Sequence, residues 1–193
     1  MLGLAAVLVI FGLRGLVYAL WVFGVVGVQA CVALWAAGRI RDFEARFHAL
    51  VEKRDIAGLE ELFKNAGVVR FFAARGWFWS REGLFYALAG RLEEAEKTLE
   101  LAWLSTQQES RFSLLPLMCR TKYRLGRMDD VAVLAEDWVR LEPEGPGVWY
   151  AMLCELRHQG SSTDTEVALR LHHAPEVRDA TDREVRDHVL SFR

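Results

Sequence analysis

Three arginines in the second half of the chain have a spacing that suits carboxylate binding. Arg120 and Arg124 are four residues apart, so they share one face of a helix. Arg157 falls on the helix expected next to them, and guanidinium groups bind carboxylates through paired hydrogen bonds. We therefore predict a groove for an acidic segment of a protein partner; the alternative is an ordinary solvated helix face. The predicted groove residues are Arg120, Tyr123, Arg124, Tyr150, Arg157 and His158.

A second candidate is an aromatic stretch interrupted by arginines. Residues 68–79 contain five aromatic side chains, a composition that suits a membrane surface or a partner protein. In that interpretation Trp77 and Phe78 are the exposed members. The other interpretation is a core between repeated units, in which Phe71 and Phe72 close the preceding unit.

Catalytic chemistry finds little support in the sequence. His172 and His173 are adjacent, so they point to different sides of a helix, and no carboxylate stands at zinc spacing from them. His48 and Glu52 are four residues apart but lack the second histidine of a metalloprotease motif. The three cysteines form no Cys-x-x-Cys pair, and no nucleophile elbow, phosphate loop or dinucleotide fingerprint is present. We expect neither an enzyme nor a metal or cofactor site.

The elements that would position these residues recur along the chain. Turns centred on Gly90, Gly126 and Gly160 are separated by 36 and then 34 residues. Around the first turn, small residues would let two helices approach closely, aromatic residues would fill the space between units, and Gly90 would supply a left-handed turn. The residues of the repeating pattern are Trp79, Gly83, Tyr86, Gly90, Ala95, Gly126, Pro143, Trp149 and Gly160.

This pattern resembles the tetratricopeptide repeat, whose period is 34 residues with a helix on each side of a turn. The resemblance implies an all-α fold, a helical-hairpin solenoid of about three to four units over residues 39–175. It also implies a concave surface that binds a peptide or a partner helix. The expected units are 40–73, 76–109, 112–144 and 146–175, and residues 176–193 are expected to form a capping helix.

The first 38 residues have a different character, since Arg14 is their only charged side chain. Residues 16–38 are an uncharged run of 23 residues, which as a helix would be about 35 Å long and able to cross a bilayer. Residues 1–13 are apolar but too short to span alone. They form either a re-entrant or interfacial helix before a single span, or one arm of a hairpin that bends at 12–15.

The charges beside this run predict its orientation. Arg39, Arg41 and Arg46 follow the run, whereas Arg14 alone precedes it, so the body is expected in the cytoplasm. No basic region precedes the apolar stretch and no convincing cleavage site follows it, which argues against a cleaved signal peptide. The net charge of −2 argues against nucleic acid as a partner.

These features together predict a membrane-anchored scaffold or adaptor, single-pass or with a short hairpin, whose solenoid binds a protein partner. The alternative is an accessory structural subunit of a multi-protein membrane complex, such as an envelope, secretion or polysaccharide export assembly. In both cases the lipid bilayer is itself a partner of residues 1–38.

Overall fold

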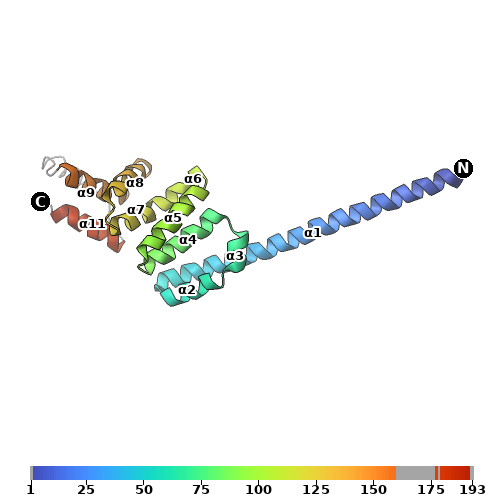
Figure 1. The fold of residues 1–193 in the computed structure, drawn as a ribbon, viewed down its shortest axis with the longest axis horizontal. Coiled ribbons are helices and arrows are strands. Elements are labelled where there is room, and N and C mark those ends of the chain that lie inside the picture. Colours follow the sequence, from blue (N-terminus) through green and yellow to red (C-terminus); the bar gives the residue numbers. More distant parts are fainter. Residues whose placement is uncertain (1, 160–176, 178, 192–193) are drawn as a thin grey trace.

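The computed structural model describes the backbone of residues 2–159, 177 and 179–191, and their side chains except those of 2–17, 19, 109, 158 and 159. Every regular element in these ranges is a helix, and the first is long and apolar. The prediction of an all-α chain that begins with a long apolar helix is confirmed. That helix projects from a body of shorter helices, so its N-terminal part lies far from the last helix of the body (Figure 1).

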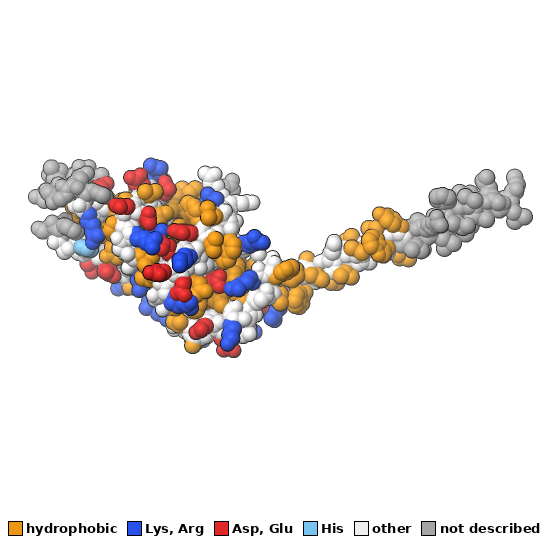
Figure 2. All heavy atoms as spheres, in the orientation of Figure 1, with side chains coloured by type: hydrophobic (Ala, Val, Ile, Leu, Met, Phe, Trp, Pro, Cys, Tyr) orange, Lys and Arg blue, Asp and Glu red, His pale blue; other side chains and the backbone are white. Residues whose placement is uncertain are grey.

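Helix α1 (Leu2–Lys53) is unbroken over 52 residues. It passes straight through residues 12–15, so the predicted hairpin bend is absent and residues 2–13 simply extend the helix. It also passes through Gly38, the expected boundary between anchor and body. Figure 2 shows hydrophobic side chains along the projecting part of α1, whereas Ala36, Phe43 and Phe47, farther along the same helix, are buried in the body.

The body is a succession of helices joined by short connections. Neighbouring helices pack in sequence, α1 on α2 and α3, α4 on α5, α5 on α7, α7 on α8, α8 on α9, and α9 on α11. The elements after α1 are α2 (Ile56–Lys64), α3 (Gly67–Phe72), α4 (Arg75–Leu88), α5 (Leu92–Ser105), α6 (Gln108–Arg111), the 3-10 helix η1 (Phe112–Leu114), α7 (Leu115–Arg124), α8 (Met128–Leu141), α9 (Gly147–Gln159) and α11 (Ala180–Ser191).

Two tight glycine turns create the helix pairs α4–α5 and α7–α8. Gly90 has a φ of 75° and Gly126 a φ of 74°, both in the left-handed region that glycine adopts without strain. The left-handed turn predicted at Gly90 is therefore confirmed. Gly160, and with it residues 160–175 of the fourth expected unit, lies outside the described residues.

Close packing of α4 on α5 depends on a second kind of glycine. A Cβ atom on Gly83 would lie 2.7 Å from Cγ and Cδ2 of Leu99. Ala95, on the facing side of α5, is fully buried. The close approach that the sequence predicts at these two positions is thus present, and no larger side chain fits at residue 83 without displacing the core.

The core has two main clusters with different chemistry. The cluster nearer the projecting helix is built largely from rings contributed by α1, α2 and α4. The cluster at the other end joins α7, α8, α9 and α11, and it includes aliphatic residues, both buried cysteines, Trp138 and Trp149. Trp79 and Tyr86 are half-buried beside the first cluster, and Pro143 is exposed in the loop between α8 and α9.

Candidate partner-binding cleft

Two of the predicted groove residues are occupied by the chain's own C-terminal helix. Arg120 donates two hydrogen bonds to Asp182 of α11, Nε to Oδ1 at 2.8 Å and Nη2 to Oδ2 at 2.6 Å. The Tyr150 hydroxyl donates to the same Oδ1 at 2.7 Å. Asp182 is only 1% exposed. The carboxylate that the sequence analysis assigned to a partner is therefore supplied from within the chain.

The electrostatics of this buried group follow from its geometry. Burial, together with the negative charge and hydrogen bond of Asp182, raises the pKa of Tyr150 far above its usual range, so the phenol stays protonated. Burial acts against the charge of Arg120, but the hydrogen bonds and the charge of Asp182 raise its pKa overall. Arg120 also lies 3.8 Å from Asp179, so its charge is balanced from within the chain.

The other predicted groove residues are dispersed. Tyr123 is half-buried, and its ring packs edge-on against Tyr150 at a centroid distance of 5.8 Å. Arg124 is exposed and its Nη1 donates a long hydrogen bond of 3.5 Å to the carbonyl of Ala87. Arg157 is exposed on α9. The side chain of His158 lies outside the described part of the chain.

The aromatic stretch is arranged differently from the prediction. Phe78 is 1% exposed and belongs to the core, whereas Phe71 is 81% exposed. Trp77 is half-buried, with the Arg81 guanidinium 4.7 Å above its ring. The reason lies in the short helix α3, which turns a single side chain, Val69, into the core. The expectation that Phe78 is exposed and Phe71 buried is therefore wrong.

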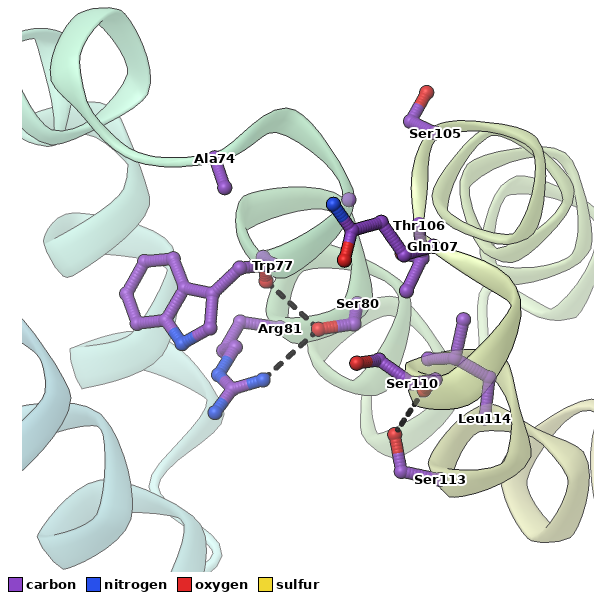
Figure 3. Close-up of a pocket in the computed structure, with 11 residues that line it drawn as sticks. Ala74, Trp77, Ser80, Arg81, Ser105, Thr106, Gln107, Ser110, Ser113 and Leu114 are labelled. Carbon is purple, nitrogen blue, oxygen red and sulfur yellow. Dashed lines mark hydrogen bonds between the residues drawn. The ribbon is translucent and has the colours of Figure 1, made fainter.

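The structure reveals a polar cleft that the sequence analysis missed. It has a volume of about 390 Å³ and lies between α4 and the segment that runs from the end of α5 through α6 to η1 (Figure 3). Six of its eleven lining side chains carry a hydroxyl or an amide group. The lining residues are Ala74, Gly76, Trp77, Ser80, Arg81, Ser105, Thr106, Gln107, Ser110, Ser113 and Leu114.

Local packing shapes the cleft at its α4 wall. A Cβ atom on Gly76 would lie 2.1 Å from Thr106 Oγ1 and 3.2 Å from the carbonyl oxygen of Ala102, so α4 and α5 meet closely there. Ser80 Oγ donates to the carbonyl of Trp77 at 2.7 Å and accepts from Arg81 Nη1 at 3.0 Å (Figure 3). These contacts fix the wall before any ligand arrives.

Arg81 is the single charged side chain that lines the cleft, and it is held in place by a residue of α1. Arg81 donates to both carboxylate oxygens of Glu44, Nη2 to Oε1 at 2.6 Å and Nε to Oε2 at 3.2 Å. Burial acts to raise the pKa of Glu44, but the hydrogen bond and charge of Arg81, with a contribution from His48, lower it overall. The pair stays ionised at neutral pH, and the cleft is close to neutral.

The cleft wall is rich in groups that form hydrogen bonds. The wall offers several hydroxyl groups, yet the residues that line it include no histidine, carboxylate, lysine or cysteine to activate them. Ser113 and Thr106 already donate to backbone carbonyls, at 2.9 Å and 2.7 Å, so their oxygens remain as acceptors.

A smaller cleft of about 280 Å³ lies on the other side of the α6–η1 segment. It combines rings and aliphatic side chains with an ion pair between Arg140 and Asp137. The segment 108–114 thus stands between two hollows. The lining residues of the smaller cleft are Trp103, Gln108, Arg111, Phe112, Leu115, Asp137, Arg140 and Leu141.

A buried ionic cluster between α5, α7 and α8 also escaped the sequence analysis. Glu96 is buried and forms ion pairs with Lys122 and with Arg127, the latter at 2.7 Å. Lys122 reaches Glu100 at 2.9 Å and Asp130 at 3.2 Å as well. Its two buried members, Glu96 and Lys122, are paired with each other, and the cluster ties three helices together.

Compared with known proteins, the chain matches no protein-family model, no curated protein and no solved structure. Its residues and their geometry therefore carry the functional inference. Among the residues that the structure describes, no group of three or more histidine, cysteine, aspartate or glutamate side chains is placed to hold a metal ion.

Proposed function

We propose that the protein is a membrane-anchored adaptor whose tetratricopeptide-like body binds a protein partner at the cytoplasmic face of a membrane. The observation that carries this proposal is the dual character of α1. Phe23 in its projecting part is 74% exposed, whereas Phe43, twenty residues on in the same unbroken helix, is 4% exposed. The same helix therefore forms the projecting apolar segment and contributes to the core of the body.

Exposed apolar surface on this scale is unfavourable in water. By length and composition α1 is able to cross a membrane, and almost none of its apolar part is covered by the rest of the described chain. Burial in a bilayer would remove that surface from water without further protein contacts. The body would then be joined rigidly to the membrane, because no flexible linker separates anchor and body.

The arginines at the membrane-proximal end of the body support a cytoplasmic orientation. Arg39 and Arg41 are exposed where α1 emerges from its uncharged run. Positive side chains next to a span are retained on the cytoplasmic side during insertion. The buried, unpaired cysteines of the body suit the reducing conditions of that compartment.

Helix pairs joined by glycine turns support the repeat architecture. The pairs α4–α5 and α7–α8 share the same left-handed turn geometry, at Gly90 and Gly126. In a tetratricopeptide-like array such pairs stack side by side and leave a continuous surface for a partner. Here α11 covers one end of the array, and the polar cleft beside the α6–η1 segment is left open.

For the partner we propose an uncharged, extended peptide segment bound in the polar cleft. The walls supply hydroxyl and amide acceptors, and Trp77 and Leu114 supply apolar contact. Confinement of both partners to one membrane raises their effective concentration, so a modest affinity of the cleft is sufficient. Arg124 and Arg157 remain exposed for an acidic stretch of the same partner.

Site-specific photo-crosslinking tests this proposal in intact cells. A photoreactive amino acid is placed at Gln107 in the cleft and, as a control, at the exposed Val133 on α8. We expect a discrete adduct from position 107 and none from position 133. Ser110→Trp, which fills the cleft, should abolish that adduct.

Two results would count against the adaptor. Absence of a cleft-dependent adduct at position 107 would overturn it. An adduct formed only from Gly27 in the projecting helix would favour an accessory subunit held through its membrane helix, because Gly27 has nothing packed on it within the described chain.

A further inference from the structure

The short helix α3 carries an aromatic pair that the body leaves uncovered. Phe71 is 81% exposed and Phe72 is 42% exposed, and their rings meet at a centroid distance of 4.9 Å. Rings of this size are normally buried in a body whose core is otherwise rich in aromatic contacts. Their position in the fold indicates what covers them.

The aromatic pair on α3 lies beside the last turn of the uncharged run of α1. The rings of Phe72 and Trp35 are 6.3 Å apart and perpendicular to each other. Trp35 is three residues inside the end of that run at Gly38, which is about 4.5 Å along the helix axis. Figure 1 shows α3 lying beside α1 where α1 leaves the body.

This contact places part of the body at membrane depth. Ala36 is buried although it belongs to the uncharged run, so the body begins before the apolar segment ends. Since α1 is straight through this region, any bilayer that covers residues 16–38 must also meet the residues that pack beside Trp35 and Ala36. The exposed face of α3 is the nearest of these.

The charges around the pair suit a lipid surface. Arg39 and Arg41 on α1 and Arg75 at the start of α4 are exposed. Arg70, next to Phe71, is also largely exposed, while its Nη2 donates to Glu82 at 2.8 Å. Aromatic rings flanked by cationic side chains are the composition that settles among phospholipid headgroups, with anionic lipids adding attraction for each cation.

We propose that α3 is a membrane-contacting helix, in which Phe71 and Phe72 enter the interfacial layer of the bilayer that α1 crosses. The inference rests on the proposed membrane span of α1. When α3 contacts the bilayer, the body has two contacts with the membrane. These contacts fix the tilt of the body relative to the membrane plane as well as its distance from the membrane. A fixed tilt would hold the polar cleft at a constant height above the lipid surface.

Spin-label depth measurements on the full-length chain test this inference. The chain is reconstituted into vesicles of phosphatidylcholine with phosphatidylglycerol, and a nitroxide is attached at Phe23→Cys, Phe71→Cys or Val133→Cys, with Cys31→Ser as background. Cys119 and Cys154 are buried, and burial raises the pKa of Cys154 to about 11, so neither thiol competes for the label.

The readout is the accessibility of each label to oxygen relative to a water-soluble nickel complex. We expect a high ratio at position 23, a low ratio at position 133 and an elevated ratio at position 71 that falls towards the value at 133 when the vesicles are replaced by a short-chain detergent. A ratio at 71 equal to that at 133 in vesicles, with 23 still high, would overturn the role of α3 alone. A low ratio at 23 would overturn the membrane span itself.

Discussion

The half of the body nearer the projecting part of α1 and the half farther from it each contain a helix pair joined by a glycine turn, but their cores differ. In the proximal half, α1 to α5, rings from several helices fill the core, as in the contact of Phe43 with Phe63 at 5.5 Å. In the distal half, α7 to α11, a buried carboxylate at Asp182 organises Arg120 and Tyr150 instead.

The two halves also differ in the surface that they leave exposed. The proximal half leaves apolar surface exposed, at Phe71 and along α1, and has an ion pair between Arg81 and Glu44 beside the cleft. In the distal half, α11 supplies the buried carboxylate that accepts hydrogen bonds from Arg120 and Tyr150. The proximal half therefore exposes apolar surface, whereas α11 covers a polar group in the distal half.

The largest effect is expected from the aromatic core of the proximal half. Phe47 is 2% exposed, so Phe47→Ala should lower the free energy of unfolding by about 3–5 kcal/mol through lost contacts and a cavity. Phe71→Ala is the matched control, with a change within about 0.5 kcal/mol in detergent. Urea unfolding followed by circular dichroism measures both, and similar losses for the two would contradict the division into inner and outer rings.

The next largest effect is expected from the buried carboxylate of the distal half. Asp182→Ala leaves Arg120 and Tyr150 without their acceptor and should cost about 3 kcal/mol. Asp187, which is exposed on the same helix and pairs with its neighbour Arg186, is the control, and Asp187→Ala should cost less than about 1 kcal/mol. Equal unfolding midpoints for the two variants would show that α11 does not close the distal half.

An intermediate and equal effect is expected at the glycine turns that the halves share. Gly90→Ala and Gly126→Ala each place a Cβ atom on a residue with φ near 75°, which should cost about 1–2 kcal/mol. Open space around both positions leaves backbone strain as the cause. The same unfolding experiment measures both variants. A loss of stability at one turn and none at the other would show that the two helix pairs are not equivalent.

The smallest effect is the pH dependence of the proximal ion pair. Since the pKa of Glu44 is lowered in the folded state, its contribution is present above the ordinary carboxylate value and is lost as the pH falls through the lowered folded value. The contribution should be below about 1 kcal/mol because both side chains are partly solvated. Glu44→Gln should remove this part of the acid dependence, and an unchanged acid profile would contradict it.

Local sequence signals predicted the parts of the fold that depend on local geometry. Gly90 predicts a left-handed turn and Gly83 predicts a close contact between two helices, and the structure has both features. The unbroken course of α1 was missed, because the glycines at 12 and 15 suggested a bend while the surrounding apolar residues favour a helix.

Contacts that are distant in sequence were beyond such reasoning. Arg120 and Asp182 are 62 residues apart, so nothing near Arg120 indicated that its carboxylate was internal. The cleft likewise combines α4 with a segment some thirty residues later. Phe71 and Phe78 exchanged their expected places because the break between α3 and α4 resets which side of the helix faces the core.

Protease protection in sealed vesicles of known orientation, combined with alkaline carbonate extraction, tests the central claim that α1 carries the body on the cytoplasmic face of a membrane. We predict that the chain stays in the carbonate pellet, and that its body is digested when the cytoplasmic face is outward but protected when that face is inward. Release of the chain into the carbonate supernatant, or the opposite pattern of protection, would contradict the account.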